Sequence, residues 1–333
     1  MVTRPEHLLR PDKRNGVIGG TGFSERAQNF ETIHTDYGDV RVGHLELGGR
    51  DTIFIARHQR LQAPFQVNYR ANVEAMKLLG VNKVASISAA GRMDKDVLPG
   101  HLVNVDDLAF MSLGARPMSF SEEEALLLHA PLTAPYSEGL RDILTNAWDQ
   151  SQAQIAELYA KYPQLELALG FHPDGTYFNS DPPWFNTNAQ ETMIRKNFPN
   201  MRLIGQTLLP ETALLRELGI AQVAIGMCTD HSNFPGAVRP VSHAGEGGVM
   251  DVAAITSGAA LILLDNAMKS LPDDFSDPFA HTMIQNSIHP NQVNWHKLRW
   301  KRPRLAVIID QGLPVDQRHP YNLIDRLRYL AVR

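Results

Sequence analysis

The residues that could do chemistry in this sequence are polar side chains that follow apolar, strand-like segments. Arg57 and His58 come directly after one such segment, in ARHQR. Ser88 ends a second segment, in SISAAG, and Thr207 ends a third, in GQTLLPE. A guanidinium, hydroxyl groups and backbone N–H groups that converge at strand ends suit an inorganic phosphate ion. Each of these residues alone is more often structural, but the four together favour a phosphate site.

A glycine cluster near the N-terminus adds to this interpretation. The segment GVIGGTGF (16–23) leads from an apolar strand into glycines that surround Thr21. These glycines fit a phosphate-binding turn, and they equally fit a turn that only needs positive φ angles. A triphosphate-binding loop would need a lysine after its last glycine, and a dinucleotide-binding turn would need glycine where Glu25 stands. The sequence therefore disfavours a nucleoside triphosphatase and a nicotinamide-dependent oxidoreductase.

The elements that must position these residues alternate along the chain. Hydrophobic patterns predict strands at 15–20, 39–48, 52–56, 83–91, 100–110, 201–207 and 220–229. They predict helices at 66–80, 136–162, 187–198, 209–219 and 246–270. This alternation predicts an α/β fold with a mostly parallel or mixed sheet that helices cover. Ligands of such sheets bind beyond the carboxyl ends of the strands.

Composition narrows the class of protein. The chain has 333 residues, of which 43% are hydrophobic and 20% charged, as in ordinary globular proteins. A formal net charge of -4 argues against nucleic acid as a partner. Cys228 is the only cysteine, so no internal disulfide is possible, which fits a reducing cytoplasm. No apolar run approaches the roughly 18 residues of a membrane span, and no secretory signal is evident, so we expect a cytoplasmic protein with no membrane partner.

Several segments, taken in their order along the chain, carry a resemblance to a known family. They are GVIGGTGF, VNYRANVEAMKLLG, SAAG, PGHLVNVDD, HAPLTAPYS, QTLLPETALLRELGI and MCTDH. The chain resembles the trimeric purine nucleoside phosphorylases over about 15–270, most closely their S-methyl-5′-thioadenosine phosphorylase branch. The resemblance implies a single α/β domain at 15–280 with a mixed, partly barrel-like sheet surrounded by helices, and a homotrimer. A flexible tail at 1–14 and a C-terminal extension at 281–333, packed on the same domain, complete the expected organisation.

The resemblance also implies the reaction. In this family phosphate attacks the anomeric carbon of a nucleoside, the purine leaves and a pentose 1-phosphate forms. The phosphate must lie beneath a sugar that develops oxocarbenium character, and the leaving purine must gain a proton or hydrogen bond at N7. We expect phosphorolysis of 5′-methylthioadenosine, with phosphate as co-substrate and with no cofactor and no metal.

Site residues follow from the resemblance by position. The phosphate ligands are expected to be Thr21, Arg57, His58, Ser88, the Ala89 backbone and Thr207. Phe185 takes the position of the ring that stacks on the purine, with Asn186 after it, although Trp184 or Phe178 could be mistaken for that ring. Asp230 is expected to donate to N7 if protonated, or to accept from a 6-amino group if ionised. A carboxylate facing the 6-position favours adenine.

The sequence departs from the family pattern at places that bear on rate and specificity. Ser232 stands where the adenine-type branch has a second aspartate, and we expect it to assist Asp230 in catalysis. Gln206 stands where a methionine usually lies against the ribose. The 5′ pocket is expected to be walled by the inner face of the long helix, at Met250, Ala253 and Ala254. Residues 235–248 are longer than the family norm and glycine-rich, which predicts a mobile lid.

Alternatives remain open at this point. The chain could be a phosphorylase with 6-oxopurine or broad specificity, a hydrolase, or a non-catalytic binder of purine nucleosides. The C-terminal extension could add an edge strand from RLAVIID (304–310) and a helix after it. The basic segment KLRWKRPR (297–304) fits a solvated or subunit-contacting face better than a nucleic-acid patch.

Overall fold

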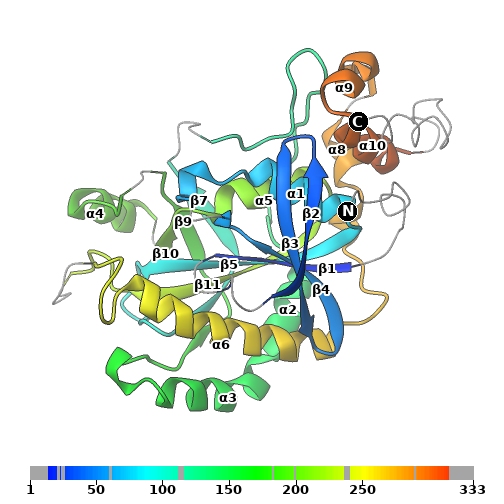
Figure 1. Cartoon of the computed structure of the whole chain (residues 1–333). Helices are drawn as coiled ribbons and strands as arrows, with labels where there is room; N and C mark the ends of the chain where they lie inside the picture. The colour runs from blue at the N-terminus through cyan, green and yellow to red at the C-terminus, as the bar shows by residue number, and fades with distance from the viewer. Residues whose placement is uncertain are drawn as a thin grey trace.

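The computed structural model of the protein describes residues 14–20, 23, 27–59, 62–111, 116–181, 184–198, 200–235, 241–288 and 290–314. Its described strands are β1 (Arg14–Gly19), β2 (Gln28–Thr35), β3 (Gly38–Leu47), β4 (Arg50–Ala56), β5 (Val81–Arg92), β6 (Leu102–Val105), β7 (Asp107–Phe110), β8 (Phe171–His172), β9 (Thr176–Asn179), β10 (Met201–Gly205) and β11 (Ala221–Asp230). Its described α-helices are α1 (Tyr69–Leu78), α2 (Glu138–Asn146), α3 (Trp148–Ala160), α4 (Asn188–Asn197), α5 (Leu208–Glu217), α6 (Val249–Ser270), α7 (Pro278–His281), α8 (Met283–Ser287), α9 (Trp295–Lys301) and α10 (Pro303–Gly312). The expected α/β architecture, a large mixed sheet flanked by helices, is confirmed (Figure 1).

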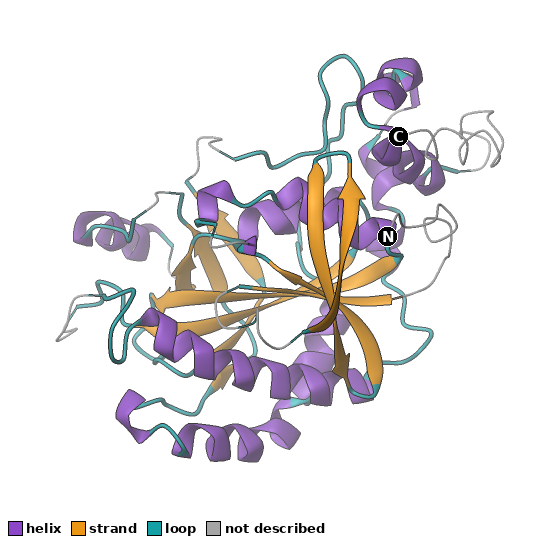
Figure 2. Ribbon diagram, in the orientation of Figure 1, coloured by secondary structure: helices purple, strands orange, loops and turns teal. Residues whose placement is uncertain are grey.

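Parallel strands form the part of the sheet that matters most for function. β4, β1, β5 and β11 lie side by side in that order, and each neighbouring pair is parallel. Their carboxyl ends therefore meet at one edge of the sheet. This edge collects the residues after β4, Gly20 after β1 and the last residues of β5 and β11. Figure 2 shows the strands of the sheet between the covering helices.

The long strand β5 connects this parallel block to the rest of the sheet. Its last residues pair antiparallel with β10, where Ile204 lies opposite Gly91. Extending this register by three residues brings Thr207, just after β10, opposite Ser88. Beyond β10, the strands β9 and β7 continue the sheet in parallel, and β6 pairs antiparallel with β11. The predicted strand 100–110 is thus two strands, because β6 and β7 pair with different neighbours.

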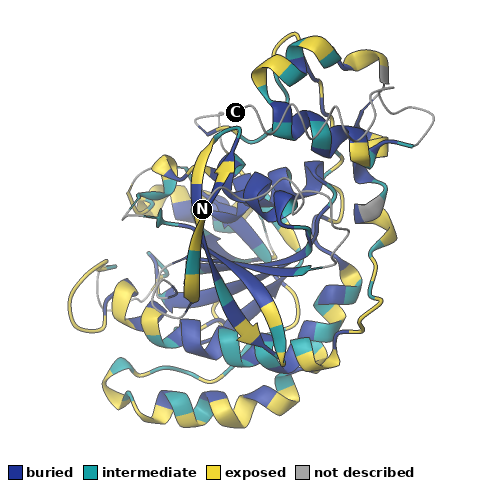
Figure 3. Ribbon diagram, turned by 45° about the vertical axis from the view of Figure 1, so that its right-hand side comes forward, coloured by how far each residue is buried: buried dark blue, intermediate teal, exposed yellow. Residues whose placement is uncertain are grey.

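Helices cover both faces of the sheet. α2, α3 and α6 pack together against one face, and α1 and α5 pack against the other (Figure 1). Among the described residues α6 alone is long and apolar enough to cross a membrane by length and composition. It contacts α3 and β11, and most of its apolar stretch is buried within the fold, as Figure 3 shows for the helices that line the sheet. α6 is therefore placed as a core helix.

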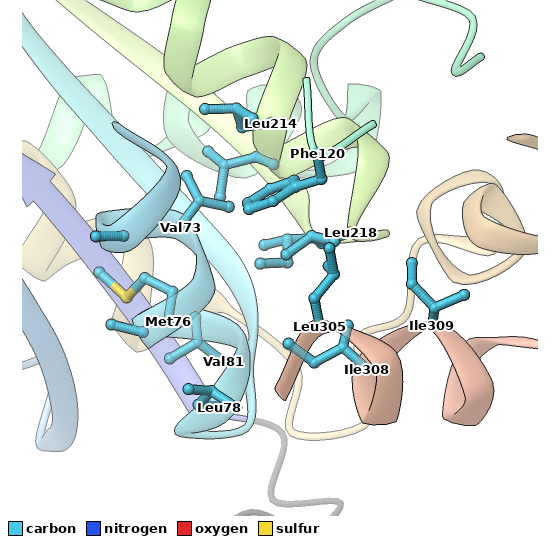
Figure 4. Close-up of a cluster of buried hydrophobic side chains, with 14 of the residues drawn as sticks. Val73, Met76, Leu78, Val81, Phe120, Leu214, Leu218, Leu305, Ile308 and Ile309 are labelled. Atoms are coloured by element: carbon cyan, nitrogen blue, oxygen red, sulfur yellow. The ribbon is translucent and has the colours of Figure 1, made fainter. Parts of the chain in front are cut away.

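The C-terminal helices share the core of the face that carries α1 and α5. Leu305, Ile308 and Ile309 of α10 are buried in the same apolar cluster as Val73 and Leu214 (Figure 4). The edge strand expected at 304–310 is wrong, because this segment is part of α10. Pro303 begins the helix, and the apolar residues 305, 306, 308 and 309 form one helical stripe on the core.

Asp36 fixes the start of α10 from a distant part of the chain. Its Oδ2 accepts hydrogen bonds from the backbone N–H groups of Arg304 and Leu305, at 2.8 and 2.9 Å. These are first-turn donors that the helix itself cannot satisfy. The turn between β2 and β3 therefore holds the C-terminal helices onto the domain. Of the tail expected at 1–14 only Arg14 is described, and residues 315–333 lie outside the described part of the chain.

Candidate active site

Arg57 is buried at the carboxyl edge, and its charge is already paired. Its Nε and Nη2 donate to Oε2 and Oε1 of Glu211, both at 2.7 Å, and the two side chains are 1% and 0% exposed. Nη1 donates to the Ile87 carbonyl at 2.8 Å. This two-point contact with a carboxylate fixes the plane of the guanidinium. Glu211 was not anticipated from the sequence, since nothing in LLPE indicates a partner 154 residues away.

Within the part of the chain that the structure describes, Nη1 of Arg57 makes one hydrogen bond, so its second N–H can donate to a ligand. The guanidinium has five N–H donors, of which Nη1 carries two. Nη1 faces the turn after β1, where a Cβ built on Gly20 would lie 2.7 Å from it. Only glycine allows the turn to approach so closely. Thr21, the next residue and an expected phosphate ligand, lies outside the described residues.

A cluster of three buried hydroxyl groups lies beside Arg57. Ser88 Oγ is 2.9 Å from Thr207 Oγ1 and 3.1 Å from Tyr177 Oη, so the register of β5 and β10 does bring the two expected phosphate ligands together. Tyr177 was not anticipated. Its hydroxyl group packs against Gly205, where any larger residue would collide with it, since a Cβ at that position would lie only 1.8 Å from Tyr177 Oη. Such hydroxyl groups can turn to donate to an anion, and the Ala89 backbone follows Ser88 on the same strand.

His58, the residue after Arg57, is held as a neutral imidazole near the turn after β1. Its Nδ1 lies 2.8 Å from the Gln62 carbonyl and therefore donates to it. Burial, together with the charge of Arg57, lowers the pKa of His58 to about 4. Nε2 is then an acceptor at neutral pH, suited to the P–OH group of hydrogen phosphate.

His243 lies near Phe185 and close enough to His58 to affect its pKa. It contributes to the lowered pKa of His58, and its ring centroid lies 6.4 Å from that of Phe185. His243 belongs to the segment 235–248 that was expected to form a lid. Residues 236–240 of that segment lie outside the described residues, so mobility there stays a prediction.

The aromatic side chains near the base side divide into two kinds. Phe185 is 45% exposed and Trp184 is 62% exposed, whereas Phe178 is 3% exposed and packs in the apolar cluster with Ile194 and Met201. Phe178 is thus a core residue, and Phe185 is available to stack on a ligand. Asn186 beside it accepts a hydrogen bond from Ser180 Oγ at 2.8 Å through Oδ1.

Asp230 ends β11 as a carboxyl group with two internal donors. Oδ1 accepts from the Ser232 N–H at 2.8 Å, and Oδ2 accepts from Thr229 Oγ1 at 2.9 Å. Burial raises the pKa of Asp230. A Cβ on Gly91 would lie 2.8 Å from Asp230 Oδ1 and from Ser232 Cβ, so both residues pack on the bare backbone of β5.

Ser232 is hydrogen-bonded to Glu191, an acidic residue that was not anticipated from the sequence. Its Oγ donates to Oε1 of Glu191 at 2.5 Å, and its backbone has a φ of 50°. Glu191 lies in the first turn of α4 and is 1% exposed. Thr187 and Gln190 form a capping box that starts this helix and so fixes where Glu191 lies. A sequence signal was available, since a first-turn glutamate after a capping box can face the protein interior.

The residues expected around the sugar are not all gathered in one place. The Gln206 side chain donates to the Trp184 carbonyl at 2.9 Å, and the Gln206 carbonyl accepts from Arg116, which also lies 3.3 Å from Asp181. On α6, Met250 and Ala254 are exposed and one turn apart, whereas Ala253 is buried. The three α6 residues therefore do not share one face of the helix.

The comparisons with known proteins agree with this arrangement. A model of the phosphorylase superfamily matches residues 14–264. The chain belongs to the phosphorylase superfamily. A probable 6-oxopurine nucleoside phosphorylase of Thermococcus kodakarensis is 30% identical over 274 residues, which cover 78% of this chain and 94% of that protein. The S-methyl-5′-thioadenosine phosphorylase of Hyperthermus butylicus is 33% identical over 238 residues, which cover 68% of this chain and 78% of that protein.

A solved structure gives the same fold. A methylthioadenosine phosphorylase sourced from an antarctic soil metagenomic library superposes with a TM-score of 0.72 at 23% identity, covering 89% of this chain and 99% of that one. The family resemblance drawn from the sequence motifs is thus confirmed, and the chain is an enzyme of the pentosyltransferase class. Because the relatives carry both methylthioadenosine and 6-oxopurine names, they leave the choice of base open.

Proposed function

We propose that the protein catalyses the phosphorolysis of 5′-methylthioadenosine by inorganic phosphate, giving adenine and 5-methylthioribose 1-phosphate. The observation that carries this proposal is the spacing along β5. The hydroxyl cluster meets β5 at Ser88, and Asp230 packs on it at Gly91. Three residues of strand span about 10 Å. A ribose ring fits between a phosphate at the first position and a purine at the second.

On the phosphate side, the proposal assigns a role to each donor. Phosphate would lie against the hydroxyl groups of Ser88 and Thr207 and the remaining N–H of Arg57. Nε2 of His58 would accept a hydrogen bond from the P–OH group of hydrogen phosphate. The pre-formed Arg57–Glu211 contact means that the guanidinium need not reorganise when phosphate attacks.

On the base side, Asp230 would assist the departure of adenine. Electrons of the breaking glycosidic bond move into the purine, and basicity develops at N7. A carboxylic acid whose pKa is raised by burial can donate its proton there. Phe185 would stack on the purine. This assignment makes Asp230 the residue that most directly affects kcat.

The experiment compares nucleosides in the presence of phosphate. We expect kcat/KM for 5′-methylthioadenosine to exceed that for inosine by at least about tenfold, the effect of one well-placed hydrogen bond. A preference for inosine would instead support the second candidate, a 6-oxopurine nucleoside phosphorylase, which the Thermococcus relative favours by name.

The remaining expectations belong to the same proposal. The enzyme would act as a homotrimer in the cytoplasm, without a cofactor and without binding nucleic acid or membranes. Exposed Met250 and Ala254 of α6 would line the 5′ pocket, where the small side chain of Ala254 leaves room for a methylthio group. Sedimentation of the purified protein tests the trimer directly.

A further inference from the structure

Glu191 accepts hydrogen bonds at every position that a carboxylate offers. Oε1 accepts from Ser232 Oγ at 2.5 Å and from Asn233 Nδ2 at 3.0 Å. Oε2 accepts from the Asn233 N–H at 3.0 Å and from Arg195 Nη1 at 3.2 Å. A carboxylate has about four lone-pair sites and no proton to give. All four contacts therefore run toward Glu191.

This arrangement fixes the direction of the Ser232 hydroxyl. A serine hydroxyl has one proton and two lone pairs. Because its proton is given to Glu191, Ser232 Oγ can offer only lone pairs to a ligand beside Asp230. An unsupported serine could turn and donate instead. Glu191 thus makes the Ser232 hydroxyl, which could otherwise donate or accept, a hydrogen-bond acceptor toward the ligand.

The two purine classes differ at the atom that such an acceptor would meet. Adenine carries an amino group at C6, which donates, whereas hypoxanthine carries an oxygen there, which accepts. We propose that Glu191 is a positioning residue that holds Ser232 as an acceptor and thereby selects 6-aminopurines over 6-oxopurines. The inference rests on the proposed function, because it requires a purine beside Asp230 and Ser232.

Glu191 also connects both walls of the expected base site. Asn233 Nδ2 donates to Glu191 and to the Asn186 carbonyl. Asn186 follows Phe185, the expected stacking residue. One carboxylate on α4 thus holds the end of β11 and the Phe185 loop in a common arrangement.

The decisive substitution is Glu191→Gln. The amide keeps the shape of the side chain but must direct its NH2 group toward one set of partners. At Oε2 the Asn233 N–H and Arg195 can both only donate, so an NH2 group there would lose two contacts. At Oε1 it would lose only the contact from Asn233 Nδ2, because the Ser232 hydroxyl can turn and accept. The amide NH2 therefore faces Ser232, and the Ser232 proton becomes free to donate to a 6-oxo group.

Calorimetric binding of free adenine and free hypoxanthine measures the effect without any turnover. We expect the wild-type protein to bind adenine more tightly, and E191Q to shift the ratio of the two dissociation constants about tenfold toward hypoxanthine. The double variant E191Q/S232A should show the same ratio as S232A within about twofold, because the two residues act through one contact. Arg195→Gln, which removes another Glu191 partner, is the matched control and should leave the ratio unchanged.

The outcomes separate the two proposals. Two results overturn the role of Glu191. In the first, E191Q leaves the ratio of the adenine and hypoxanthine dissociation constants unchanged. In the second, E191Q shifts this ratio as much in S232A as it does in the wild type. If E191Q does not fold, S232A alone decides, since it must lower the preference for adenine and an unchanged ratio contradicts the inference. Selective adenine binding with the expected shift, but no phosphorolysis of any nucleoside, supports the role of Glu191 and refutes only the proposed function.

Discussion

The buried pair of Arg57 and Glu211 gives a prediction with two linked parts. Replacing Glu211 by Gln leaves the Arg57 charge buried without a counter-charge. Removing one partner of a buried ion pair typically costs about 3–5 kcal/mol. Both side chains are at most 1% exposed, and two 2.7 Å contacts join them, so solvent cannot substitute for the lost charge. Because Gln keeps one acceptor, we expect the lower end, about 3 kcal/mol, without phosphate.

Phosphate should restore part of this loss. If the anion accepts a hydrogen bond from the second Nη1 N–H of Arg57, it supplies the missing negative charge in E211Q. Ligand binding stabilises the native state in proportion to the logarithm of its affinity. Urea denaturation with and without saturating phosphate should therefore show a larger phosphate-dependent gain for E211Q than for the wild type.

Glu217→Gln is the matched control for this experiment. Glu217 lies on the same helix, α5, and is also buried, but it accepts a hydrogen bond from the Phe120 N–H at 2.6 Å and forms no ion pair that the structure records. At pH 8 this variant should lose no stability. Two results would refute the role of the ion pair. One is a destabilisation of E211Q below about 1 kcal/mol, and the other is an equal phosphate-dependent gain in stability for E211Q and the wild type.

Three further predictions concern titration and the hydroxyl cluster. Burial raises the pKa of Glu217 from 4.5 to about 7, so the native state keeps a proton that the unfolded chain loses. The free energy of unfolding should therefore fall as the pH rises from about 4.5 through 7, by up to about 3 kcal/mol at about 1.4 kcal/mol per pH unit. Urea midpoints of Glu217→Gln should not show this dependence on pH. Tyr177→Phe removes one hydroxyl next to Ser88 and should raise KM for phosphate about tenfold with a smaller effect on KM for the nucleoside, whereas equal changes in both would deny Tyr177 a place at the phosphate. Bound phosphate should raise the pKa of His58 from about 4 toward neutrality, which NMR of its imidazole ring can follow. A pKa that phosphate does not change would show that His58 does not contact the anion.

The parts of the site that the sequence predicts are those fixed by one strand and its end. The apolar runs at 83–91 and 220–229 become the adjacent parallel strands β5 and β11, so Ser88 and Asp230 reach the same edge as expected. Thr207 also reaches Ser88, although this depends on the antiparallel register of β10, which no local pattern indicates. The largely exposed strand β2 and the short strands β8 and β9 were missed. Exposed or brief strands carry little hydrophobic signal.

What the sequence could not supply is the identity of partners from distant elements. Glu211, Tyr177 and Glu191 each determine what an expected site residue can do, and each comes from another element of the fold. Arg57 illustrates the consequence. Its position after β4 suggested a guanidinium open to phosphate, but Glu211 takes two of its donors. Only the packing of α5 on the sheet makes that pairing.

The central claim is that the carboxyl edge of the parallel strands holds a phosphate ion that attacks the sugar of a purine nucleoside. Phosphorus NMR of a mixture of the protein, 5′-methylthioadenosine and inorganic phosphate tests it most directly. We predict that a new sugar phosphate monoester appears in a one-to-one ratio with released adenine, and that no adenine is released when phosphate is omitted. Adenine released without phosphate, or without formation of the ester, would contradict it.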